Sequence, residues 1–186
     1  GMSEIKNELE DLCFLYLEPQ KYHEIAHLVE VKKDERAKLV EKMIGEISDM
    51  LNKHNFKFRI FGRSKHLYSI HKKMVTKNKR FEEILDLYAI RIVTESELNC
   101  YEILGYIHAK YHPIPGRLKD YIAMPKENMY QSLHTSLIAP NGQPFEIQIR
   151  TAEMHRTAEY GIAAHWKYKE NLTGDDNEEQ KISWLR

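Results

Sequence analysis

Several features that would assign this chain to a specialised class of protein are missing from it. Its 186 residues include only two cysteines, Cys13 and Cys100, and no Cys-x-x-Cys spacing. Neither a disulfide framework nor a cysteine-held metal is therefore expected, and a reduced cytoplasmic protein fits best. The sequence has no run of about 18 apolar residues and no signal-peptide pattern, so nothing in it predicts a membrane span or secretion. The 42% of hydrophobic residues can build the core of one domain with a helical annex.

The zero net charge conceals a segregation of charge along the chain. Residues 1–50 hold 12 acidic and 7 basic side chains, whereas residues 53–80 hold 10 basic and no acidic ones. A one-signed block of this length favours a phosphate-bearing partner over an ordinary solvated face.

The first third of the sequence, residues 1–54, is expected to be a helical connector. Residues 4–17 and 20–31 have helical patterns separated by Pro19, and Asp34 is expected to cap a third helix that ends near Asn52. The segment His23–His27 spells His-Glu-x-x-His, a zinc pattern of metalloproteases. Since a catalytic zinc needs a third protein ligand and no downstream pattern supplies it, we do not predict a zinc site.

Predicted strands and helices alternate in the rest of the chain, which indicates an α+β fold with helices packed against a mixed sheet. Strands are expected at residues 56–61, 87–94, 121–124, 132–139 and 143–150, and helices at 63–76, from a Ser96 cap to 110, and from a Thr151 cap to 170. Gly62 is expected to end the first strand and to let the backbone approach a phosphate at the next helix N-terminus. Residues 55–170 would form this domain, and the acidic residues 171–186 a flexible end.

The last predicted strand follows Asn141-Gly142, the strongest short signal for a hairpin turn. Its apolar side chains fall on one face, and Glu146, Gln148 and Arg150 fall on the other. This polar face is either an ordinary solvated sheet surface or a rigid support that holds a carboxylate in a polar cleft.

Asp86 and Arg91 present a second choice between structure and function, because charges beside a buried strand are costly unless something uses them. The two residues form either a salt bridge or part of a site. Residues five apart face opposite sides of a regular strand, so Asp86 shares a site only from the strand's edge or across a bulge.

Together these residues indicate a chemistry. Carboxylates that hold magnesium against a polyphosphate, with Arg and Lys neutralising charge, are what phosphoryl-type transfer requires. Asp86 and Glu146 provide the carboxylates, and the basic block and later loops provide the cations. We therefore expect an enzyme that positions an attacking hydroxyl and stabilises charge.

Six segments, in order, resemble the synthetase domain of the RelA/SpoT homologue family over roughly residues 8–170. They are Gly62–Met74, Asp86–Ile92, Gly116–Ala123, Pro125–Thr135, Glu146–Thr151 and Ala163–Lys169. This family makes the alarmones ppGpp and pppGpp in the stringent response. The resemblance implies a fold related to the nucleotidyltransferases, and transfer of pyrophosphate from ATP to the 3′-hydroxyl of GDP or GTP with release of AMP.

Carried over by position, the resemblance implies that Asp86 and Glu146 hold Mg²⁺, and that Glu146 completes the metal site or acts as base on the 3′-hydroxyl. Arg63 and Arg91 would sandwich the adenine, and Tyr130 would stack on the guanine. The other residues expected to contact substrates are Lys65, Ser69, Arg117, Lys119, Lys126, Asn128, His134 and Gln148.

Several details refine this resemblance. Arg117–Asp120 is similar to the basic variant of a loop that, in this family, goes with bifunctional members and with GDP preferred over GTP. Met129 stands where glycine is usual, and Ser64 where proline is common. The chain contains no His-Asp dipeptide, so we expect a synthetase domain excised from a longer bifunctional-type member, without hydrolase activity. Ribosome or tRNA contacts are expected only through domains absent here.

An alternative from another class is a catalytically silent module that contacts RNA or the ribosome through residues 53–80. The presence of both Asp86 and Glu146 favours turnover, because phosphate binding alone needs neither carboxylate.

Overall fold

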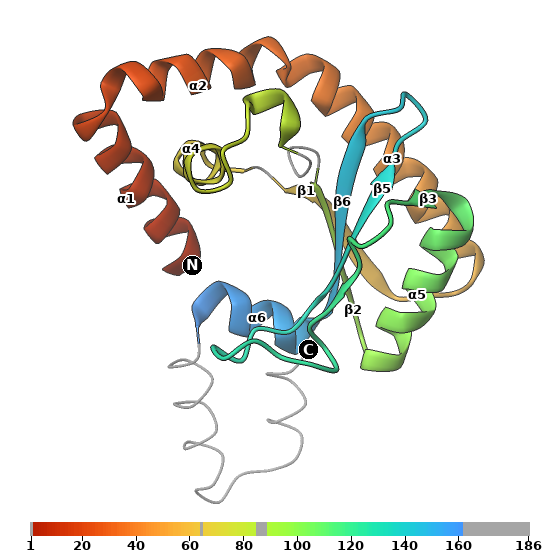
Figure 1. The fold of residues 1–186 in the computed structure, drawn as a ribbon. Helices are drawn as coiled ribbons and strands as arrows, with labels where there is room; N and C mark the ends of the chain where they lie inside the picture. Colours follow the sequence, from red (N-terminus) through yellow and green to blue (C-terminus); the bar gives the residue numbers. More distant parts are fainter. Residues whose placement is uncertain (1, 64, 85–88, 162–186) are drawn as a thin grey trace, which may run out of the picture.

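The computed structural model describes residues 2–63, 65–84 and 89–161, shown in Figure 1. Three helices come first: α1 (Met2–Leu17), α2 (Pro19–Val31) and α3 (Lys33–Lys53). The elements that follow are β1 (Phe58–Arg63), α4 (Leu67–Thr76), the short 3-10 helix η1 (Phe81–Glu83), β2 (Ala89–Thr94), α5 (Glu97–Lys110), β3 (His112–Pro113), β4 (Lys119–Asp120), β5 (Leu133–Ile138), β6 (Pro144–Thr151) and α6 (Ala152–Tyr160).

The strands form one mixed sheet in the order β1-β2-β6-β5-β3, and β4 also pairs with β5. The central strands β2 and β6 run parallel, whereas the other pairs are antiparallel. A mixed sheet with flanking helices confirms the predicted α+β class.

Helices α3 and α5 cover one face of the sheet (Figure 1) and form the main hydrophobic core with it. The buried residues of α3 recur every four positions along one side of the helix: Leu39, Met43, Ile47 and Leu51. From β6, the alternating residues Phe145, Ile147 and Ile149 point into the same core. Helix α3 thus shares its core with the sheet, while the predicted division at residue 54 stays a prediction.

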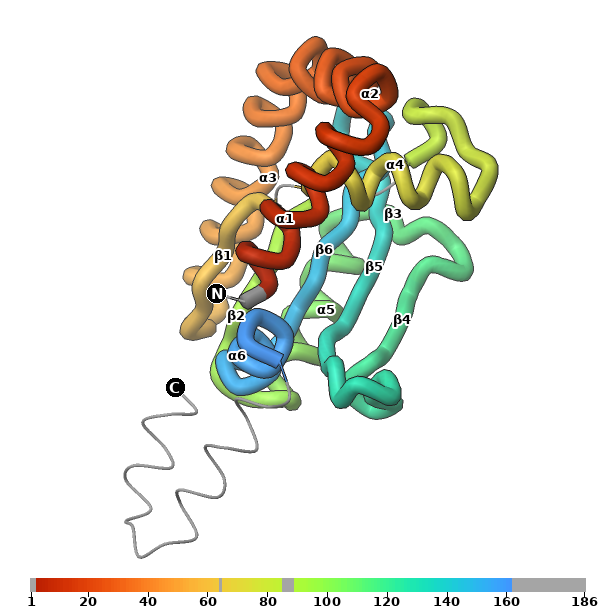
Figure 2. Tube along the Cα trace, turned by 90° about the vertical axis from the view of Figure 1, so that its left-hand side faces the viewer, coloured from red at the N-terminus to blue at the C-terminus, as the bar shows by residue number. Residues whose placement is uncertain are grey.

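The other face of the sheet carries α1, α4 and α6 (Figures 1 and 2). A second cluster, built around Phe14, Ile25, Ile70, Phe81 and Ile84, joins α1, α2, α4 and the turn after α4. These helices stand over the face of the sheet that bears the polar residues.

Gly62 does not end the first strand as predicted. It lies inside β1, opposite Ile90, and the strand continues to Arg63, which pairs with Ala89. The next helix accordingly begins at Leu67 and not at Arg63. A Cβ atom at Gly62 would lie 2.9 Å from Val40 Cγ1 of α3. The glycine is therefore needed for close packing of the helix on the strand.

Two further local predictions are wrong. Residues 121–124 form a turn rather than a strand, because Asp120 Oδ1 accepts hydrogen bonds from the amides of Ile122 at 3.0 Å and Ala123 at 2.9 Å. The third helix begins at Lys33, after an N-cap residue, Lys32, that makes no side-chain capping bond, so Asp34 is not its cap.

Other expectations hold. Ser96 and Thr151 cap their helices by accepting hydrogen bonds from the amides of Asn99 and Met154. The hairpin turn has Gly142 at a positive φ of 81°. The expected beginning of the second strand at Leu87 and the expected extension of the last helix to Glu170 lie outside the described residues.

Within the described ranges, no helix is both long and apolar enough to cross a bilayer.

We expect Gly62→Ala to destabilise the protein by about 1–2 kcal/mol, because the added methyl group overpacks the contact with Val40. Denaturant unfolding would measure the change, and Val40→Ala in the same chain should restore stability. Gly45→Ala is the matched control: a Cβ there meets nothing within 4 Å, and alanine should stabilise α3 by up to about 1 kcal/mol. A neutral Gly62→Ala would contradict the packing role.

Candidate active site

The register of the sheet gathers the polar candidates on the face opposite α3 and α5. Arg63 pairs with Ala89, which pairs with Glu146. In the next row, Arg91 pairs with Gln148, which pairs with His134. Since paired residues project to the same side of a sheet, these side chains share one face. The polar face of β6 is therefore part of a charged cluster and not an isolated solvated surface.

Glu146 faces a small cleft of about 60 Å³. The lining of this cleft is rich in cations and consists of Lys73, Lys77, Lys79, Arg117, Glu83, Ile84, Ser136 and Glu146 itself. A carboxylate opposite several basic side chains is an arrangement that suits a metal-bound polyphosphate. Three of these cations come from the predicted basic block, and Arg117 comes from the predicted basic loop.

Gln148 is the centre of the hydrogen-bond network, and its side chain is almost fully buried. Its Oε1 atom accepts from Arg91 Nε at 3.2 Å, from Arg91 Nη2 at 3.1 Å and from Arg150 Nη2 at 2.7 Å. Its Nε2 atom donates to Glu146 Oε1 at 2.7 Å. One amide thus orients two guanidinium groups and the candidate catalytic carboxylate.

Arg63 and Arg91 come from neighbouring strands and lie two residues apart in register. The Arg91 Nη1 atom forms an ion pair with Glu159 Oε1 of α6 at 3.2 Å, and its guanidinium lies 6.0 Å from the centre of the Phe61 ring. Burial, and then the nearby positive charge of Arg63, lower the pKa of Arg91. The register places both guanidinium groups on the same face of the sheet.

Tyr130 lies beside this cluster at the end of a polar loop. Its hydroxyl is 2.8 Å from His134 Nε2 and accepts a hydrogen bond from Arg150 Nη2 at 2.9 Å. The Lys126 ammonium lies 5.1 Å from the Tyr130 ring and 4.6 Å from the Tyr121 ring. The loop therefore presents two aromatic rings with a cation between them.

The same loop contains Met129, at the position where the resemblance led us to expect glycine. Met129 adopts a positive φ of 65°, a left-handed conformation that costs a residue with a side chain roughly 1–2 kcal/mol. The turn is closed by a hydrogen bond from the Met129 amide to the Lys126 carbonyl at 2.8 Å. Asn128 Oδ1 supports it by accepting from the Tyr130 amide at 3.1 Å. Asn128 thus shapes the loop that carries Tyr130.

His134 is neutral at physiological pH. Burial, followed by the charges of Arg150, Lys126, Arg63 and Arg91, lowers its pKa to about 3. Its Nδ1 atom is 3.9 Å from Glu146 Oε1, but a neutral imidazole forms no ion pair. His134 offers the site a hydrogen bond rather than a positive charge.

The N-terminus of α4, where we predicted an anion, holds a carboxylate of the protein itself. Asp11 of α1 accepts hydrogen bonds from the Tyr68 amide at 2.8 Å and from the Leu67 amide at 3.3 Å. Ser69 Oγ lies 2.9 Å from His66 Nε2, and this nitrogen lies 3.1 Å from Glu10 Oε2. The first helix therefore secures the beginning of α4 directly after Lys65.

Not every predicted residue lies in the described part of the chain. Asp86 and Ser64 lie outside it, so the pairing of Asp86 with Glu146 stays a prediction. Lys119 is exposed and pairs with His134.

His23 and His27 are exposed on α2, and the described residues contain no group of three possible metal ligands.

Three contributors were missed by the sequence interpretation. Glu159 and Asp11 gave no local signal, because each acts on a partner more than 50 positions away. Arg150 was predicted to lie on the same face as Glu146 and Gln148 but was not assigned to the site, although this shared face was a signal for it.

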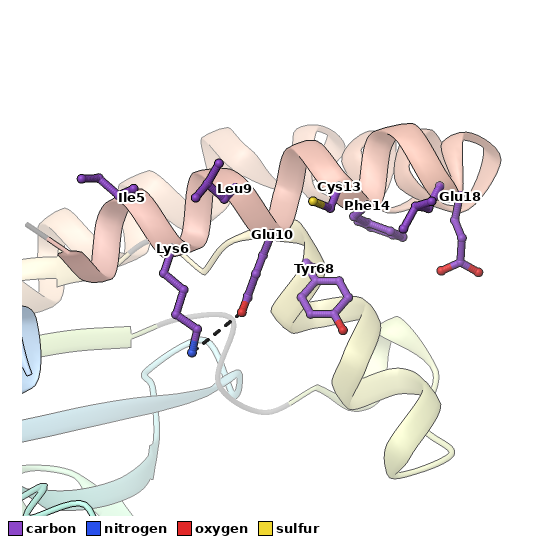
Figure 3. A pocket seen from close by; sticks show the side chains of 9 residues that line it. Ile5, Lys6, Leu9, Glu10, Cys13, Phe14, Glu18 and Tyr68 are labelled. Carbon is purple, nitrogen blue, oxygen red and sulfur yellow. Dashed lines mark ion pairs between the residues drawn. The ribbon is translucent and has the colours of Figure 1, made fainter.

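A larger cavity, of about 770 Å³, lies away from this cluster along α1 (Figure 3). Leu9, Phe14 and Leu17 contribute to a mainly apolar lining, and Lys6, the cation of the lining, pairs with Glu10 at 3.8 Å. The cation-rich lining of the smaller cleft beside Glu146 suits a phosphate better than this apolar lining does.

The sheet order and the flanking helices are similar to those of solved structures. The fold is that of the alarmone synthetases: small alarmone synthetase 1 from Bacillus subtilis, bound to its product pppGpp, superposes with a TM-score of 0.60 over 88% of each chain at 22% identity. A model of the region found in RelA / SpoT proteins matches residues 62–173, more than half of the chain. The chain therefore belongs to the RelA/SpoT family, which confirms the resemblance.

Two curated relatives show how much of a longer protein this chain represents. A GTP pyrophosphokinase of Streptomyces coelicolor is 51% identical over 170 residues, covering 91% of this chain and 20% of the relative. The bifunctional (p)ppGpp synthase/hydrolase SpoT of Escherichia coli is 48% identical over 171 residues, covering 92% of this chain and 24% of the relative. The chain thus spans a fifth to a quarter of the length of these relatives.

Asp11→Ala should destabilise the protein by about 1 kcal/mol, because it leaves the first amides of α4 without an acceptor. Hydrogen exchange at the Leu67 and Tyr68 amides should accelerate more than exchange in α3 or α5. Glu8→Ala, exposed on the same helix, is the control and should leave both amides protected. Unchanged protection in Asp11→Ala would show that the carboxylate does not hold α4.

Proposed function

We propose that the chain is an ATP:GDP/GTP 3′-pyrophosphotransferase, which makes ppGpp or pppGpp and releases AMP. One observation supports this most strongly: Glu146 lies in a cation-lined cleft on the same sheet face as the Arg63–Arg91 pair and the Tyr130 loop. Family membership and the names of the relatives agree with it. The reaction needs a donor site, an acceptor site and a carboxylate between them.

The donor ATP would bind at the β1 side of the cluster. The planar guanidinium groups of Arg63 and Arg91 would enclose the adenine, a role that lysine does not fill. Glu159 and Gln148 hold Arg91 in place for it. Lys65 and Ser69, at the beginning of α4, would contact the phosphates.

The acceptor would bind at the β5 side, with guanine on the Tyr130 ring. Lys126 and the neutral His134 are close enough to this ring to contact the same nucleotide. Arg117 and Lys119 would place positive charge near its 5′-diphosphate, and a preference for GDP over GTP is what the resemblance of Arg117–Asp120 to the basic loop variant implies. Arg117 already lines the cleft that contains Glu146.

Glu146 would act between the two nucleotides. Gln148 orients its Oε1 atom, and a carboxylate held in this way can act as a base on the 3′-hydroxyl. The carboxylate also fits Mg²⁺, since this ion is bound by one or two carboxylates together with substrate phosphates. Glu146 would hold the ion with Asp86, and the bound ion would neutralise charge on the transferred pyrophosphate.

The RNA-binding alternative is less well supported by the arrangement of the basic block. Lys73, Lys77 and Lys79 line the cleft of Glu146. Lys57, in contrast, comes directly before the first residue of β1, and its Nζ atom lies 3.9 Å from Glu95 Oε1. The block is thus divided between the cleft and a separate surface. A binding module would also have no use for the oriented Glu146 carboxylate.

Incubation with ATP, GDP and Mg²⁺, followed by separation of the nucleotides, should yield ppGpp and AMP. Glu146→Gln should lower the rate by at least about 100-fold while nucleotide binding persists, because the amide cannot accept the proton. Glu153→Gln, on α6, is a control for loss of a carboxylate and should remain active. RNA retention with a steep salt dependence and no AMP release would instead support the binding module.

Tyr130→Ala should raise the KM for GDP by about 5–100-fold, because stacking on an aromatic ring contributes about 1–3 kcal/mol per base. The KM for ATP should change much less, since Arg63 and Arg91 are on other strands. Initial rates at varied GDP and ATP would measure both constants. Equal loss for the two nucleotides would remove Tyr130 from the acceptor site.

A further inference from the structure

Arg150 is a buried charged residue that the proposed chemistry does not use. Its side chain is only 1% exposed, and its Nε and Nη1 atoms have no hydrogen-bond partner among the described residues. No carboxylate of the described chain lies within ion-pair distance of it. Burial lowers the pKa of Arg150 to about 10, which still leaves the guanidinium charged at neutral pH.

Such a group is a poor contributor to stability. A buried cation loses its hydration, and each unpaired donor adds a further desolvation cost. Replacing buried ionic groups by apolar residues of similar volume is often neutral or stabilising. Buried polar atoms without partners need another explanation, and functional sites are where such local costs are found.

The contacts that Arg150 does make lead to the site. Its Nη2 atom donates to the Tyr130 hydroxyl at 2.9 Å and to Gln148 Oε1 at 2.7 Å, and its guanidinium lies 5.3 Å from the centre of the Tyr130 ring. Gln148 in turn donates to Glu146 at 2.7 Å. A continuous path of hydrogen bonds therefore runs from the Tyr130 hydroxyl through Arg150 and then Gln148 to the Glu146 carboxylate.

We propose that Arg150 is a positioning residue for the acceptor nucleotide, which fixes the Tyr130 ring and, through Gln148, aligns the Glu146 carboxylate with it. This inference rests on the proposed function. Arg150 would thus contribute to the affinity for the acceptor nucleotide without touching it, because its side chain is buried. Donor binding would depend on Arg91, which shares Gln148 Oε1 with Arg150 but has an ion pair of its own with Glu159.

The geometry explains why arginine occupies this position. One nitrogen of the planar guanidinium, Nη2, bonds both the Tyr130 hydroxyl and Gln148 Oε1, while the Cζ atom lies 5.3 Å from the centre of the aromatic ring. A lysine ammonium is a compact, strongly hydrated point charge on a flexible stem, and it would hold the ring less rigidly. Arg150→Lys should therefore retain part of the effect.

The test compares Arg150→Met with Arg150→Lys in steady-state synthesis assays. Arg150→Met should raise the KM for GDP about tenfold or more, as expected for loss of a hydrogen bond from a charged donor, and lower kcat. The KM for ATP should change by less than about threefold. Thermal stability should be unchanged or higher, because an unpaired buried charge has been removed. Arg150→Lys should lie between Arg150→Met and the wild type.

Two further variants separate positioning from general disturbance. Tyr130→Phe keeps the ring but removes the hydroxyl, and the double variant with Arg150→Met should be no worse than Arg150→Met alone. Arg59→Met is the matched control, since Arg59 is exposed and lies in the same row of the sheet as Arg150. It should leave both KM values unchanged.

The outcomes distinguish the two levels of inference. If the wild-type chain makes alarmone but Arg150→Met raises the KM for ATP as much as the KM for GDP, the role of Arg150 is overturned and the proposed function is not. The same holds if the effects of Arg150→Met and Tyr130→Phe are fully additive. Absence of synthesis by the wild-type chain would overturn the proposed function and this role with it. Loss of GDP affinity together with retained stability and non-additivity supports the proposal.

Discussion

The register of the parallel pair β2–β6 is the constraint on which the rest of the site depends. It sets Ala89 opposite Glu146 and Arg91 opposite Gln148, and the antiparallel neighbours extend these rows to Arg63 and His134. A slip by one residue would turn every charged side chain of β6 into the apolar core. The tight packing of α3 and α5 against the opposite face opposes such a slip, so the hydrophobic core indirectly positions the charged groups.

The charged cluster in turn shows a balance between stability and function. One oxygen of Gln148 accepts from two arginines, and burial lowers the pKa of both guanidinium groups. In a low-dielectric site these hydrogen bonds are strong, but every unpaired polar atom is costly. Burial, followed by the same charges, lowers the pKa of His134 and keeps its ring neutral. The network is thus organised for fixed orientation of its members rather than for maximum stability of the fold.

The helices before the sheet also contribute to this organisation. Asp11 of α1 occupies the N-terminus of α4, and the chain between β1 and α4 carries Lys65. The first amides of α4 are thus satisfied within the protein, and the positive charges that line the cleft are the side chains of Lys73, Lys77, Lys79 and Arg117. A segment that appeared from its sequence to be only a connector therefore supports the site.

The amino-acid sequence by itself determined the elements whose signals are local. Periodicity located the buried side of α3 and the two faces of β6, and Ser96 and Thr151 marked helix beginnings, because these depend on residues within four positions of each other. Its motifs identified the family and most of the clustered residues. Only the tertiary structure decided that Gly62 faces Val40, that Glu159 pairs with Arg91, that Asp11 caps α4 and that Arg150 is buried. Each joins segments far apart in the chain, and packing and register, which no local pattern encodes, set the distances between them.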